Sequence, residues 1–167
     1  MTTLVPFLTF CQALGVFIGA FTALWSEFAY VRAMRDGKID AAERAHLRII
    51  GRGLRFGMSL LLLASLGLVI VAYVLHTAQQ PALTADYWTV TVLTLVIISI
   101  SWALSRRHIS FAFGSAILFT AWWFLAYSTL GWILPLSFGA SILFFIVATA
   151  IFYGILEYAR FLALHKI

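Results

Sequence analysis

The chain has 167 residues, of which 63% are apolar and 10% are charged, and its formal net charge is +5. Charged residues make up about a quarter of a soluble domain, so this composition excludes an ordinary soluble domain and indicates an integral membrane protein. The single cysteine, Cys11, excludes a disulfide bond within the chain.

The apolar residues form long runs, at residues 4–30, 56–76, 87–105, 109–130 and 133–158. Each can cross a hydrocarbon core of ~30 Å, which takes about 20 helical residues. None shows the alternation of polar and apolar residues that barrel strands have, and only helices or closed barrels satisfy the backbone in lipid. The sequence therefore predicts an all-α membrane protein, with residues 1–167 in a single domain of five transmembrane helices.

The basic residues gather in three places. Of the eleven Lys and Arg residues, seven lie in the first connection, two in the third, and two after the last run. Because Lys and Arg concentrate on the cytoplasmic side, we predict an outside N-terminus and a cytoplasmic C-terminus in a bacterial inner membrane. Residues 31–55 then form a cytoplasmic turn and helix extension. The first run follows no positive region and is too long for a signal peptide, so we expect a retained span.

This topology predicts a labelling pattern. Cysteines introduced at Lys38 and at Gln80 should react with a membrane-impermeant thiol reagent from opposite sides of the membrane, because only the first of these two connections is basic. Labelling of intact cells and of inverted vesicles measures this. Reaction of both positions from the periplasmic face would contradict the five-span topology.

A GxxxG motif, Gly15 and Gly19, lies in the first run. Small residues let helix backbones approach closely in lipid, so the motif favours packing within the chain or against another subunit. With Tyr30 and Phe56 taken as the inner ends of the first two helices, Gly19 lies level with Gly67, its expected counterpart.

A second GxxxG motif, Gly53 and Gly57, lies near the expected inner surface, too close to it to meet the first motif. We expect it to let another element lie close to the second helix there.

The turn from Asp36 to Glu43 resembles the second half of an EF-hand loop. Arg32 and Met34 occupy the positions of the early carboxylate ligands, so a calcium site is not expected. Asp40 and Glu43 instead form a capping box that starts a helix expected to run unbroken to about His76.

Four arginines follow this turn in a stripe along one helix face. The stripe suits anionic lipid headgroups or, equally, an acidic partner, although a solvated basic face that follows the positive-inside bias is the simpler explanation. Its members are Arg44, Arg48, Arg52 and Arg55.

Hydroxyl side chains mark one face of the third helix. Such groups usually bond to their own helix or to a neighbouring one, and a polar permeation path is the alternative. They belong to Thr91, Thr94, Ser101 and Ser105.

Two acids, Glu27 and Glu157, lie near the inner ends of the first and last spans and are candidate functional groups. Structural pairing is the expectation, and handling of protons or cations is the alternative. Replacing either acid is expected to cost about 1 kcal/mol or less, as for a surface pair. The possible partners are Arg55, Arg106, Arg107 and Arg160.

No histidine lies near the middle of a span, and no nucleophile with a base, glycine-rich phosphate loop or cysteine pair occurs. Haem, metal or other cofactor sites and enzymatic activity are therefore not expected.

Residues 12–57 carry one resemblance. The succession of Gly15, Gly19, Glu27, Phe28 and the turn from Asp36 to Glu43 resembles a family of small, uncharacterised bacterial multi-helix membrane proteins, loosely similar to the copper-resistance-D type. Members of that family often have a histidine one turn before the glycines, where this chain has Gln12. The resemblance implies a multi-helix membrane protein and no established activity.

The functional expectation is a non-enzymatic scaffold or accessory subunit of a larger membrane complex. Its partners would be lipids and other membrane subunits or itself, with no nucleic acid. The alternative is a small transporter or channel for protons or cations that uses Glu27, Glu157 and the hydroxyl face of the third helix.

Overall fold

The computed structural model describes residues 3–35, 48–49, 51–75, 83–132 and 136–165. Over this part of the chain, five helices are long and apolar enough to cross a membrane, as the sequence predicts. The turn from Asp36 to Glu43, with its expected capping box, and Arg44 lie outside the described residues.

The helices cover the expected apolar runs, with shifted ends. The last helix, for example, runs seven residues past Tyr158. Apolar runs mark the hydrocarbon, but a helix continues into the interface wherever its residues allow it. The elements are α1 (Leu4–Arg35), η1 (Leu54–Met58), α3 (Ser59–Val74), α4 (Ala85–Ser105), α5 (Phe111–Thr129) and α6 (Phe138–His165).

The second span is not the unbroken α-helix that the sequence suggests. A π-helical turn, η1, occupies Leu54–Met58 and leads directly into α3. A π turn inserts one extra residue into a helix and changes the direction in which the flanking side chains point. The π turn lies where this span touches α1. Gly57, within the turn, and Gly53, just before it, both pack against α1.

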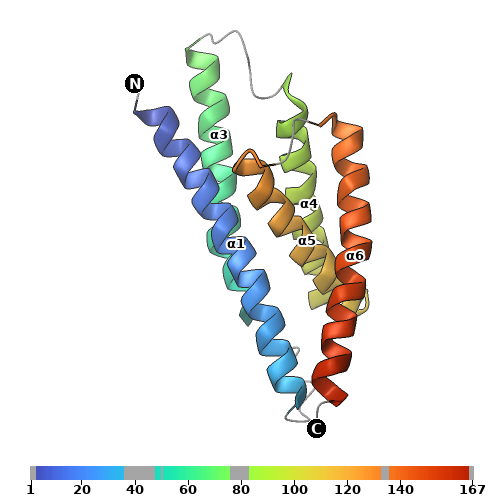
Figure 1. The fold of residues 1–167 in the computed structure, drawn as a ribbon. Coiled ribbons are helices and arrows are strands. Elements are labelled where there is room, and N and C mark those ends of the chain that lie inside the picture. Colours follow the sequence, from blue (N-terminus) through green and yellow to red (C-terminus); the bar gives the residue numbers. More distant parts are fainter. Residues whose placement is uncertain (1–2, 36–47, 50, 76–82, 133–135, 166–167) are drawn as a thin grey trace.

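α5 is the central helix of the bundle (Figure 1). It packs against α1, α4 and α6, whereas α3 packs extensively on α1 only. Over half of α5 is buried, including Trp122 and Leu125, and its side chains form much of the apolar core. α1 begins at one end of the bundle and α6 finishes at the other, where the two helices converge.

The contact between α1 and η1 corrects the expected pairing of the glycines. A Cβ atom added to Gly15 would lie 2.7 Å from the Gly57 carbonyl oxygen and 2.8 Å from the Leu61 nitrogen. One added to Gly57 would lie 3.1 Å from the Gly19 nitrogen. The two GxxxG motifs therefore face each other, and Gly67 packs on Leu8 instead.

The expected pairing took Tyr30 and Phe56 as the level inner ends of their helices, and neither is an end. Helix α1 continues to Arg35, and helical residues also precede Phe56 in the second span. Because Gly19 faces Gly57 and not Gly67, the two antiparallel helices are offset by about ten residues, or ~15 Å, from the predicted alignment. Gly53 fits the same arrangement, because it lies against Thr22 of α1. Gly19 also packs against the ring of Trp122 on α5.

Candidate functional site

Arg160 of α6 binds both of the acids that the sequence singles out. Its Nη2 donates hydrogen bonds to the Glu27 Oε2 atom and to the Ser115 Oγ atom, each at 2.7 Å. Its Nη1 donates to the Glu157 Oε1 atom at 2.8 Å. One guanidinium group therefore joins α1, α5 and α6, and we call these four residues the Arg160 cluster.

Two aromatic rings complete the surroundings of the guanidinium. The Arg160 Cζ atom lies 5.1 Å from the ring centroid of Tyr30 and 5.6 Å from that of Phe111. The two rings stack on each other with their centroids 4.2 Å apart. A cation close to aromatic faces in a desolvated site gains about 2 kcal/mol.

Helical spacing explains why each helix supplies neighbouring groups. Glu157 and Arg160 are three residues apart, and so are Glu27 and Tyr30, while Phe111 and Ser115 are four apart. Residues at these spacings lie on one face of a helix, one turn from each other. Each of the three helices thus needs only one face to build the cluster.

The two acids differ in how deeply they are buried. Glu27 is 7% exposed and Arg160 is 6% exposed, whereas the Glu157 side chain is 44% exposed. The premise of a surface-like pair is therefore wrong for Glu27, whose pair is buried, and a larger cost is expected there. The small cost expected for removing Glu157 remains a prediction. The Glu27 Oε1 and Arg160 Nε atoms are also buried, and neither bonds to another described residue.

The other candidate partners do not join the cluster. Within the described part of the chain, Arg160 is the only basic residue that forms an ion pair. Arg106 and Arg107 are exposed at the turn between α4 and α5. Arg55 lies two residues from Gly57, which faces Gly15 and Gly19. It is therefore level with about Phe21 of α1, roughly 9 Å along the helix from Glu27.

The arginine stripe is described only in part. Arg48, Arg52 and Arg55 are exposed, and Arg44 lies outside the described residues. Contact of this stripe with lipid headgroups or an acidic partner stays a prediction.

Two of the four hydroxyl groups predicted to share a face of α4 bond to their own helix, as expected. Thr91 donates to the Tyr87 carbonyl oxygen at 2.8 Å, and Ser105 donates to that of Trp102 at 2.7 Å. The Ser101 Oγ atom is buried and bonds to no described residue. Thr91 and Thr94, in the first half of the helix, line a cavity.

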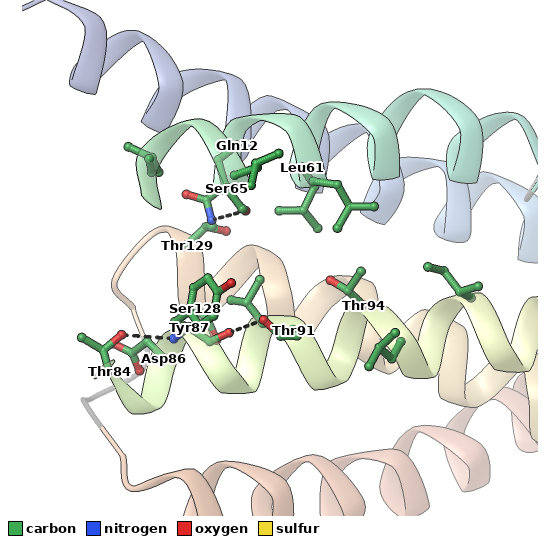
Figure 2. Close-up of a pocket in the computed structure, with 16 residues that line it drawn as sticks. Gln12, Leu61, Ser65, Thr84, Asp86, Tyr87, Thr91, Thr94, Ser128 and Thr129 are labelled. Carbon is green, nitrogen blue, oxygen red and sulfur yellow. Dashed lines mark hydrogen bonds between the residues drawn. The ribbon is translucent and has the colours of Figure 1, made fainter. Parts of the chain in front are cut away.

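That cavity is a groove of about 600 Å³, open to the side, between α3 and α4. It lies at the end of the bundle opposite the Arg160 cluster. Figure 2 shows Gln12, Ser65 and Thr129 close together on one side, with Asp86 and Tyr87 across from them on α4. The Gln12 Nε2 atom donates to the Ser65 Oγ atom at 3.2 Å, so the amide joins α1 to α3 at this point.

Sequence reasoning did not find the groove. Its polar groups come from α1, α3, α4 and α5, and only α4 with its N-cap supplies several of them on one face, among them Tyr87, Thr91 and Thr94. The signal in the sequence was therefore partial: the hydroxyl face of the third span, Gln12 in the first, and the hydroxyl pair Ser128 and Thr129 at the end of the fourth.

Within the described residues, no three His, Cys, Asp or Glu side chains lie together in a group that could hold a metal ion. Comparison of the chain with protein-family models, curated proteins and solved structures finds no match. The resemblance to the bacterial multi-helix family stays a prediction.

Proposed function

We propose that the protein is a non-enzymatic scaffold or accessory subunit of a larger complex in the bacterial inner membrane. The observation that supports this most is the Arg160 cluster, in which one arginine binds both of the candidate acids. Polar groups at membrane depth often mark transport paths. Here they connect three helices of the bundle and so serve its architecture.

The distance between the two polar features also favours a structural role. Ser115 belongs to the Arg160 cluster, whereas Ser128 lines the groove, and thirteen residues of α5 separate them by ~20 Å. The side chains of α5 between them are mostly apolar and buried, Leu118, Trp122 and Leu125 among them. A proton or cation path through the acids would have to cross this packed core.

In the proposed orientation, the end with the Arg160 cluster and the arginine stripe faces the cytoplasm. Exposed arginines there gain about 1 kcal/mol each near an anionic leaflet. Lipid headgroups and other membrane subunits, or a second copy of the chain, are the proposed partners.

Isolation from the native membrane tests the proposal. A tagged chain released in lipid nanodiscs should behave as a complex larger than one copy, with a companion in a fixed ratio that repeats between preparations. A tagged membrane protein of similar size, handled in parallel, controls for chance association. A chain that is always a lone monomer would contradict an accessory role.

A further inference from the structure

The lining of the groove between α3 and α4 changes character along its length. Most of the polar side chains gather near the start of α4, whereas the part toward the middle of the bundle is mainly apolar, with Thr94 as a polar group in it (Figure 2). The polar end includes Gln12, Ser65, Thr84, Asp86, Ser128 and Thr129. The mainly apolar part includes Leu61, Leu62, Val90, Leu95 and Ile98. An amphiphile, with a polar head and an apolar tail, matches this order.

The length of the groove matches one leaflet of a bilayer. From Asp86 to Ile98 it follows twelve residues of α4, or ~18 Å. The hydrocarbon core of a bilayer is ~30 Å thick, so a partner's transmembrane helix would have to extend well past the groove, while a lipid chain stays within one leaflet. The volume of about 600 Å³ lies within the 300–1,000 Å³ typical of small-molecule sites.

The charge at the polar end selects the headgroup. Asp86 is the one charged residue among the described side chains that line the groove, and it is exposed. The sequence has no Lys or Arg between Phe56 and Ser105. A headgroup with an ammonium group is therefore attracted, and a headgroup with a net negative charge is repelled.

The geometry points to a binding site for one amine-headed phospholipid. An acyl chain lies along the apolar part of the groove, and the ammonium group lies at Asp86. The site serves the leaflet at the end of the bundle that lacks basic residues. It is independent of the proposed function, because it needs no protein partner.

Native mass spectrometry of the purified chain, titrated with phosphatidylethanolamine or phosphatidylglycerol, tests the site. Two neighbouring leucines of α3 provide a matched pair: Leu62 lines the groove, and Leu63 is exposed outside it. Leu62→Trp fills the groove and should weaken retention of phosphatidylethanolamine by about tenfold, while Leu63→Trp should leave it unchanged. Equal retention by both variants would overturn the site.

The headgroup assignment has its own test. The unaltered chain should prefer phosphatidylethanolamine to phosphatidylglycerol by about two- to fivefold, the range for one exposed charge pair. Asp86→Asn should abolish this preference while the chain still binds both lipids. Equal or tighter binding of phosphatidylglycerol by the unaltered chain would overturn the assignment.

A photo-reactive side chain introduced at Leu62 distinguishes the occupants without relying on a groove-filling variant. Irradiation in native membranes should give an adduct with the mass of one phospholipid. An adduct with a polypeptide would overturn the lipid assignment in favour of a partner helix.

Discussion

Replacing Arg160 by leucine is expected to lower the free energy of unfolding by about 3–5 kcal/mol, the range for breaking a buried ion pair. The change leaves the Glu27 carboxylate buried and without its cation. It also removes the hydrogen bond to Ser115 and the contacts with Tyr30 and Phe111. Thermal or denaturant unfolding in a mild detergent measures the loss.

A double variant shows whether the loss of stability comes from the unpaired charge of Glu27. Glu27→Leu combined with Arg160→Leu removes both charges and should be much less destabilising than Arg160→Leu alone, because apolar residues often replace a buried pair at little cost. Glu157→Gln should cost about 1 kcal/mol or less, since that carboxylate is half exposed. An Arg160→Leu variant as stable as the unaltered chain would show that the cluster does not hold the helices together.

Gly15→Ala is expected to destabilise the bundle by about 1–3 kcal/mol, the usual cost of overpacking. The added Cβ would lie within 2.8 Å of two backbone atoms, the Gly57 carbonyl oxygen and the Leu61 nitrogen. Backbone atoms cannot rotate aside as the end of a side chain can, so α1 and the second span must separate. The unfolding assay used for Arg160→Leu measures the effect.

Gly154 of α6 provides the matched control. Nothing lies within 4 Å of the Cβ that would be added there. Gly154→Ala should therefore be neutral or stabilise by about 0.5–1 kcal/mol through the better helix propensity of alanine. Equal effects of the Gly15 and Gly154 substitutions would mean that close approach of α1 and the second span is not required.

The sequence predicts the helices well because the signal for a span is local. About 20 consecutive apolar residues decide it, whatever the rest of the chain does. The same reasoning named Glu27, Glu157 and Arg160 as possible partners, because all three lie near one end of their spans. The burial of Glu27 and Arg160 could not be predicted, since it depends on α5 placing Ser115 and Phe111 beside Arg160.

The parts that could not be predicted depend on how helices align with one another. The predicted contact between Gly19 and Gly67 failed because both helices continue past the residues taken as their inner ends, Tyr30 in α1 and Phe56 in the second span. The π turn at Leu54–Met58 has no clear sequence signature beyond Gly57 within it and Gly53 just before it. The groove combines side chains from four helices, so no periodicity within one helix reveals it.

The central claim is that Glu27 joins α1 to α6 through Arg160, and that neither Glu27 nor Glu157 carries protons or cations. Measurement of proton, sodium and potassium flux in proteoliposomes tests this most directly, with the unaltered chain compared with Glu27→Gln and Glu157→Gln. We expect no flux above that of empty liposomes in any of the three, and a loss of stability that is larger for Glu27→Gln. A flux through the unaltered chain that disappears in either variant, with the fold intact, would contradict the claim.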